Sequence, residues 1–313
     1  MSGWKYALLG GGALAAVALA GAAALAAEAA NVAPHENAKE PGRPNRWGYG
    51  YSAKYDAEIA AGDVHKVRYK DNHIWLMEVS NPPGFTMEVH GHPYPSVFAR
   101  DSAGPPAGAG LSGTSRYLDP DSPKNGQSWR EAPGPDGHKY PQCTSADPQA
   151  PHNPANAGDW PLHFFRIEFI RVDQDDTNAM RHRYNGPASE KTLYETPEMR
   201  LVEETVPVGK TLPAHTEAYP SVLAFDAVPS FDALVKVSGP GAGKSEPPLG
   251  YIAPLCMTTE AGKVAALTNK GELPIHFYRV DFKRVGKDGE GEDLKDHWKE
   301  WYPYMLQMKG VKP

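Results

Sequence analysis

Two stretches decide the fold of this chain because their sequences are similar: VHGHPYPSV at residues 89–97 and AHTEAYPSV at residues 214–222. The same shift of 125 residues aligns the chain for some distance on either side of them. A further block, residues 156–166, recurs at residues 269–279 with a shift of 113. The sequence therefore contains two copies of one domain, and the first copy is the longer one between its blocks.

Composition narrows the class of protein. The 313 residues are 40% hydrophobic, enough for two modest cores. Gly and Pro number 31 each, which favours many short strands joined by turns. With a net charge of -6 and no basic run, we expect no nucleic-acid partner.

The His-x-His stretch at residues 90–92, together with the Pro-His pair at residues 151–152, resembles the motifs of the cupin superfamily. The first cupin motif runs Gly, several residues, His-x-His, a few residues and Glu; here Gly84 is followed by His90 and His92. The second motif ends in Pro, a His, three residues and Asn, and Pro151, His152 and Asn156 match it. The resemblance covers roughly residues 66–172 and 191–285.

The resemblance implies an all-β chain of two tandem cupin domains, each a jelly-roll β-barrel, related by internal duplication. We interpret the Gly- and Pro-rich residues 102–140 as a long loop over one mouth of the first barrel. The predicted order is a signal peptide at 1–27, an extended arm at 28–50, the N-terminal cupin at 51–172, a linker at 173–190, the C-terminal cupin at 191–285 and a tail with a short helix at 286–313.

A metal site is expected in the first barrel. Residues i and i+2 of a strand face the same side, so His90 and His92 project together. The motif makes His152 the third ligand. Three neutral imidazoles suit one divalent transition metal: Fe, Mn, Ni, Cu or Zn. Ser96 stands near the position where cupins often supply a Glu, and Glu88 is expected to face away from the His pair.

The second copy has a degenerate site. His215 and Glu217 fill the pair positions, but Ala265 stands where the first copy has His152. Two ligands are too few for a tight site, so we expect no metal there. A small polar-lined cavity and a purely structural barrel are the alternatives.

Other side chains are assigned to the walls of the barrels. Aromatic side chains and one hydroxyl are candidates to line the first pocket, although core packing explains each equally well: Trp75, Phe85, Tyr94, Ser96 and Phe98. His163 and His276 recur in both copies and are interpreted as structural. Arg166 and Arg279 are expected to pair with carboxylates at the seam between the copies, for example Glu78 or Glu203.

The two cysteines, Cys143 and Cys256, differ by 113 and so occupy the same place in their copies. If the axis relating the copies passes close by, they can form a disulfide in an oxidising compartment. Otherwise they are two half-buried thiols kept by duplication.

The N-terminus is typical of export. Lys5 precedes an apolar run that ends in Ala24-Leu25-Ala26-Ala27, the pattern of a secretory signal. The predicted location is periplasmic or secreted, without membrane contact after cleavage; an uncleaved membrane anchor is the alternative.

Two functions from different classes fit the sequence. The first is a metal-dependent enzyme that performs dioxygenation, isomerisation or decarboxylation on a small oxygenated molecule. The second is a non-catalytic small-molecule-binding or structural protein with a vestigial metal site. No catalytic residue is singled out, and assembly into a homo-oligomer through exposed strand edges is a further hypothesis.

Overall fold

The structure is a computed structural model that describes residues 53–81, 84–100, 113–116, 128–130, 141–157, 162–170, 182–225, 234 and 254–283. The expected signal peptide, arm and C-terminal helix lie outside these residues. Among the described residues, no helix combines the length and apolar character needed to cross a membrane.

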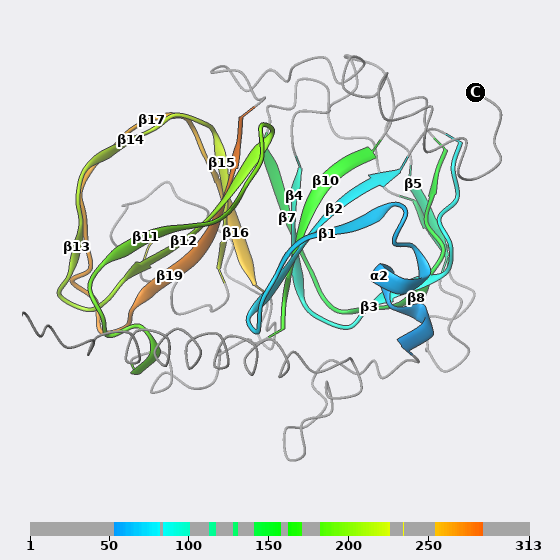
Figure 1. Ribbon diagram of the computed structural model, residues 1–313, viewed down its shortest axis with the longest axis horizontal. Coiled ribbons are helices and arrows are strands. Elements are labelled where there is room, and N and C mark those ends of the chain that lie inside the picture. The colour runs from blue at the N-terminus through cyan, green and yellow to red at the C-terminus, as the bar shows by residue number, and fades with distance from the viewer. Residues whose placement is uncertain are drawn as a thin grey trace, which may run out of the picture.

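Two β-barrels lie side by side (Figure 1). The first copy has a five-stranded sheet in the order β1-β2-β10-β4-β7, and two smaller sheets, β3-β8 and β6-β5-β9, complete it. Its strands are β1 (His65–Lys70), β2 (Ile74–Asn81), β3 (His90–His92), β4 (Ser96–Arg100), β5 (Gly113–Arg116), β6 (Ser128–Arg130), β7 (Gln142–Ala146), β8 (Gln149–His152), β9 (Ala155–Asn156) and β10 (Leu162–Phe169).

The second copy repeats this plan with a five-stranded sheet, β11-β12-β19-β15-β16, and the pairs β13-β18 and β14-β17. Its strands are β11 (Ser189–Glu195), β12 (Met199–Val206), β13 (Thr211–Leu212), β14 (His215–Glu217), β15 (Ser221–Phe225), β16 (Leu255–Thr259), β17 (Gly262–Val264), β18 (Leu267–Thr268) and β19 (Ile275–Phe282). The all-β fold and the duplication are therefore confirmed.

The duplication extends to details of the backbone. The β1–β2 ladder shifts register between Val67 and Tyr69, and the β11–β12 ladder does so between Thr192 and Tyr194, 125 residues later. The turn glycine Gly84 has φ 69°, and its counterpart 125 residues on, Gly209, has φ 73°. Side chains rarely adopt this region, so glycine is needed in both turns.

The two five-stranded sheets pack face to face (Figure 1). Their apolar side chains form one shared core. On β10 the alternate residues Phe165, Ile167 and Phe169 belong to this seam. Two pairs of aromatic rings meet across the seam. The ring centroids of Phe165 and Phe282 are 6.1 Å apart, and those of Phe169 and Tyr278 are 6.0 Å apart. Because side chains alternate along a strand, the intervening residues of β10 face into the first barrel.

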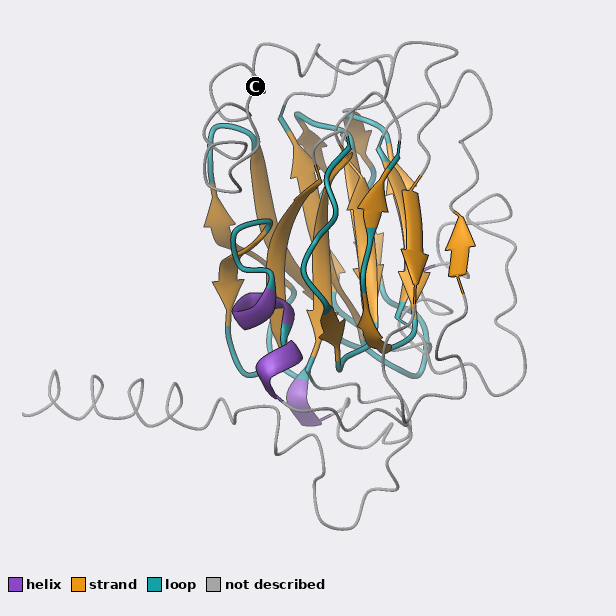
Figure 2. Ribbon diagram, turned by 90° about the vertical axis from the view of Figure 1, so that its right-hand side faces the viewer, coloured by secondary structure: helices purple, strands orange, loops and turns teal. Residues whose placement is uncertain are grey.

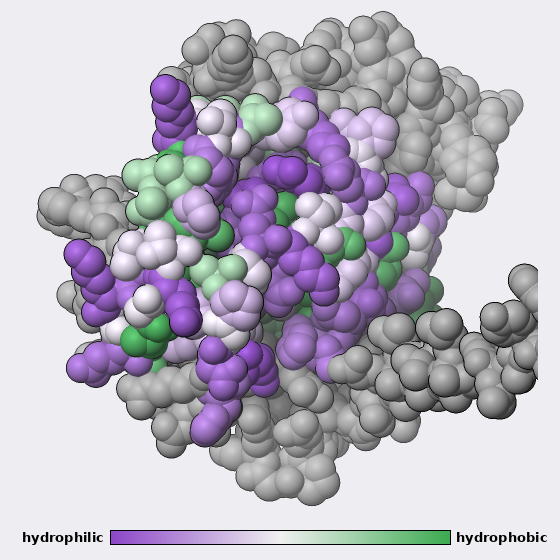
Figure 3. Space-filling model, turned by 60° about the vertical axis from the view of Figure 1, so that its left-hand side comes forward, coloured by the Kyte–Doolittle hydropathy of each residue, from purple (hydrophilic) through white to green (hydrophobic). Residues whose placement is uncertain are grey.

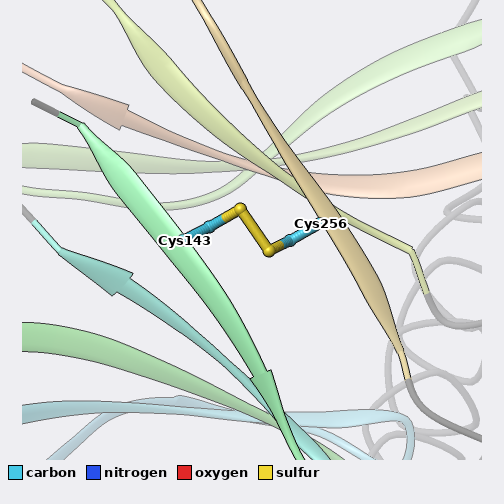
Figure 4. Close-up of a disulfide and its surroundings, with 2 residues drawn as sticks. All are labelled: Cys143 and Cys256. Atoms are coloured by element: carbon cyan, nitrogen blue, oxygen red, sulfur yellow. A yellow bond between two sulfur atoms is a disulfide. The ribbon is translucent and has the colours of Figure 1, made fainter. Parts of the chain in front are cut away.

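A disulfide joins the two copies (Figure 4). It links Cys143 on β7 with Cys256 on β16, whose Cα atoms are 6.1 Å apart. The sequence was compatible with either a disulfide or two separate thiols, and the structure contains the disulfide.

Residues 102–140 are not entirely a loop, which corrects the sequence interpretation. Strands β5 and β6 lie within them and pair antiparallel, and β5 also pairs with β9. Strands of four and three residues are too short for an alternating pattern to stand out.

The second barrel presents a largely hydrophilic face, broken by small, separate hydrophobic patches (Figure 3). The short helices η2 (Ala53–Tyr55) and α2 (Ala57–Ala60) lie at one end of the first barrel (Figure 2).

Candidate metal centre

Four histidines gather inside the first barrel. His90 and His92 come from β3, and His152 ends β8, which pairs with β3 so that His90 lies opposite His152. His65 begins β1 directly after α2. Asp56 holds this end in place, since its side chain caps α2 and its backbone bridges to Gly91.

The imidazoles are close enough to share one ion. The potential ligand atoms of His65, His90 and His92 all lie within 4.8 Å of one another. The ring of His152 lies beside the predicted pair, with centroid distances of 4.8 Å to His90 and 5.6 Å to His92. The structure thus brings the three predicted histidines together, but the tightest trio contains His65 in place of His152.

Hydrogen bonds fix the orientation of every ring. Nδ1 of His90 bonds the carbonyl of Glu88 at 2.7 Å, and Nδ1 of His152 bonds that of Ala150 at 2.8 Å. Nδ1 of His65 bonds the carbonyl of Ala61 at 3.3 Å. A carbonyl only accepts, so each ring donates from Nδ1 and its lone pair is on Nε2, the atom that would bind a metal.

The fourth ring is held by a buried carboxyl group. Nδ1 of His92 lies 2.6 Å from Oε1 of Glu168, and both side chains are almost completely buried. Oε1 of Glu168 also lies 3.1 Å from Nε of Arg166. Nη1 of this arginine donates a hydrogen bond to Oε1 of Gln149 at 2.6 Å. Such partners orient ligand histidines in metal sites.

Burial keeps the imidazoles neutral. It lowers the pKa of His90 to about 4 and those of His65, His92 and His152 well below the usual value. Burial also raises the pKa of Glu168 to about 8, outweighing the charge of Arg166. Neutral imidazoles are the form that binds metals, so the chemistry of the donor set fits a divalent transition metal.

A carboxyl group on a neighbouring strand lies next to the position where the first motif lacks its Glu. Ser96, which stands near the motif position of the Glu, is paired with Glu168 across the β4–β10 ladder. The Ser96 hydroxyl is buried and has no hydrogen-bond partner among the described residues. Glu88 is exposed, as expected, but it lies before β3, so its exposure does not come from alternation along that strand.

The aromatic pocket candidates belong to the interior of the first barrel or its edge. Trp75 and Tyr94 form an edge-to-face pair with centroids 5.6 Å apart, and Lys70 lies over the Trp75 ring. Phe85 packs in the apolar core under α2. Phe98 is partly buried, and the guanidinium of Arg166 lies 4.7 Å from its ring centroid.

The expected pairing of Arg166 with Glu78 is wrong. Glu78 bonds His163 at 2.9 Å and Arg68 at 2.6 Å. His163 shares the seam face of β10 with Phe165, whereas Arg166, one residue further on, points to the other face. The equivalent pair in the second copy, His276 and Glu203, is 3.2 Å apart, so Arg279 does not bind Glu203 either. Both histidines are hydrogen-bonded within the wall, as predicted.

Sequence reasoning missed His65 and Glu168. His65 belongs to neither cupin motif, and its place in the site depends on the β1–β2 ladder and on α2. One signal was available: the shift of 125 aligns His65 with Glu190, and both are metal-ligand residue types.

The degenerate pair of the second copy lies on β14, which pairs with β17. Nε2 of His215 is 3.3 Å from Oε1 of Glu217. His215 is part-exposed, in contrast to its buried counterpart His90.

No protein-family model matches the sequence, and no curated protein matches it. Among solved structures, a cupin domain from Bordetella pertussis Tohama I is 16% identical and covers 34% of this chain and 91% of its own, with a TM-score of 0.26. The oxalate decarboxylase of Lactobacillus farciminis, in a formate complex, is 9% identical over 80% of this chain and 91% of its own, with a TM-score of 0.24.

A salicylate 1,2-dioxygenase from Pseudaminobacter salicylatoxidans is 12% identical over 67% of this chain and 71% of its own, with a TM-score of 0.22. Such distant likenesses transfer no activity to this chain. The description of the fold rests on the strand pairing and the duplication: with the His-x-His strand inside the first of two repeated β-barrels, the chain has the fold of a two-barrel cupin protein.

Proposed function

We propose that the first barrel binds one divalent transition metal through its buried histidines and uses it to act on a small oxygenated molecule. The observation that carries this proposal is shared by all four rings: Nδ1 of each is engaged by an oxygen atom, which leaves Nε2 to bind the metal. His90 and His92 are ligands in either arrangement of the site. The third ligand is His65 in the tightest trio, or His152 at the motif position.

A metal held there would supply Lewis acidity and open coordination positions, the requirements of dioxygenation, isomerisation and decarboxylation alike. The protein's own groups prepare the site. Glu168 accepts a hydrogen bond from Nδ1–H of His92 and so directs Nε2 of that ring inward. Arg166, fixed by Gln149 and stacked on Phe98, adds a positive charge to the barrel interior.

The alternative is a non-catalytic barrel whose metal only binds a ligand or stabilises the fold. Deep burial favours it: His65, His90, His92 and His152 are each exposed by 4% or less. A catalytic metal needs a position that water or substrate can reach.

Two measurements separate these readings. Metal content after loading with Mn²⁺ and desalting should be about one equivalent in the parent and near zero in His90→Ala. The variants His65→Ala and His152→Ala are measured in the same way. The third ligand is the histidine whose replacement abolishes metal binding. Water-proton relaxation of the Mn²⁺-loaded protein then reports on the open position: strong enhancement supports an enzyme, and none supports the non-catalytic barrel. No bound metal in the parent would refute both.

We also propose that the protein is exported. The apolar N-terminal run and the disulfide between Cys143 and Cys256 support this, since disulfides persist in oxidising compartments. N-terminal sequencing of the protein recovered from cell fractions tests it. A mature start near residue 28 is expected, whereas an intact Met1 in the cytoplasmic fraction would contradict export.

A further inference from the structure

The second barrel carries charged side chains at the positions where the first has its histidine trio. The shift of 125 residues aligns His65, His90 and His92 with Glu190, His215 and Glu217. Strand pairing agrees with this alignment at Glu217: His92 lies opposite Gln149, and Glu217 lies opposite Gly262, which the shift of 113 aligns with Gln149.

A guanidinium group lies among these side chains. Nη1 of Arg279 is 2.6 Å from Oε1 of Glu217, and Nη2 is 3.2 Å from Oε1 of Glu190. Arg279 also binds Asp281 at 2.7 Å and contacts Glu204. With 1% of its side chain exposed, Arg279 is a fully buried cation held by four carboxyl groups.

The equivalent arginine of the first barrel is held differently. Arg166 donates from Nη1 to Gln149 and contacts Glu168 through Nε. In the second barrel Gly262 replaces Gln149 and offers no side chain to bind the guanidinium. Position 79 changes as well, since the shift of 125 aligns the apolar Val79 of the first copy with Glu204 of the second. Both arginines contact a carboxyl group through Nε, but Nη1 of Arg279 meets carboxyl groups where Nη1 of Arg166 meets an amide.

The acidic side chains need a cation where they stand. A buried carboxylate is costly unless it is paired. Glu217 is 9% exposed, and its second oxygen, Oε2, has no hydrogen-bond partner among the described residues. The imidazole of His215 lies within 3.3 Å of Glu217 and 4.0 Å of Glu190, so the three side chains converge.

We infer that Arg279 takes the place of a metal ion in the second barrel, and that Glu190, His215 and Glu217 form a latent divalent-cation site that opens when this arginine is removed. Two carboxylates and one imidazole suit a cation such as Mn²⁺. The two copies then obtain their cation in different ways. In the first, neutral histidines bind a metal ion, and in the second, carboxylates bind the guanidinium of Arg279.

The test is the Mn²⁺ content of the full chain after loading and desalting. Arg279→Ala should bind about one equivalent more than the parent, and Arg279→Ala/Glu217→Ala should lose that gain. Arg200→Ala is the matched control: it also removes a guanidinium that binds Asp281, yet Arg200 touches none of the three ligands, so no gain is expected.

Arg279→Ala leaves the carboxylates without their cation, so its thermal unfolding is recorded with and without Mn²⁺. A thermal midpoint that rises with Mn²⁺ in this variant more than in the parent supports the inference. No gain in bound Mn²⁺ overturns it, whether the variant folds or remains unfolded with Mn²⁺ present. Because the readout is the difference between variant and parent, it stands even if the first barrel binds no metal.

Discussion

Glu168→Gln should weaken metal binding without unfolding the protein. The substituted group lies 2.6 Å from Nδ1 of His92, and both side chains are exposed by no more than 2%. Gln keeps an oxygen that can accept the hydrogen bond but cannot take up negative charge, and water cannot supply that charge in so buried a place. Loss of such a partner typically weakens metal affinity by about 10- to 100-fold, or roughly 1.4 to 2.8 kcal/mol.

The matched control is Glu88→Gln. His90 binds the backbone carbonyl of Glu88, which the substitution retains, and the Glu88 side chain is exposed. This variant should keep the affinity of the parent.

A competition titration of Zn²⁺ against a chromogenic chelator measures all three proteins, and circular dichroism checks their folding. If folded Glu168→Gln binds as tightly as the parent, the role assigned to Glu168 is wrong. An equal loss in Glu88→Gln would point to a general effect of charge and would also count against it.

Three further predictions concern stability and pH. Despite its burial, the pKa of Glu78 is lowered to about 2 by its hydrogen bond with His163 and by its arginine partner. Its contribution to the free energy of unfolding, up to about 3 kcal/mol, is present above pH 4.5 and lost as the pH falls toward 2. The acid unfolding of Glu78→Gln should therefore depend less steeply on pH than that of the parent. Cys143→Ser/Cys256→Ser opens a link spanning 113 residues and should lower the free energy of unfolding by about 2–5 kcal/mol in denaturant titrations, and a reducing agent should then have no further effect on this variant. Because burial lowers the pKa of His90 to about 4, dialysis should leave bound metal constant from pH 8 to 6 and release it as the pH approaches 4; release centred near pH 6.5 would contradict the buried site.

Much of the fold could be predicted because it depends on local patterns that occur twice. The seam follows from strict alternation: Phe165 and Ile167 point to the partner sheet while Arg166 and Glu168 point inward. The pairing of Arg166 with Glu78 could not be excluded from alternation alone, because it depends on the register between β2 and β10, which places Phe165 and not Arg166 opposite Glu78.

The site could be predicted only as far as its motifs extend. His90 and His92 share a strand, so their common direction follows from spacing alone. His65 and Glu168 enter through strand pairing over long sequence distances, which no local pattern encodes. Whether the two cysteines meet depends on how closely the sheets pack at the seam, and equal positions in two copies do not fix that distance.

The most direct test of the account is an anomalous difference map, collected at the absorption edge of the metal, from crystals of the metal-loaded protein. We predict one strong peak in the first barrel, bounded by Nε2 of His90, of His92 and of His65 or His152, and no comparable peak beside Arg279. A loaded crystal without a peak among these histidines, or with its strongest peak in the second barrel, would contradict the account.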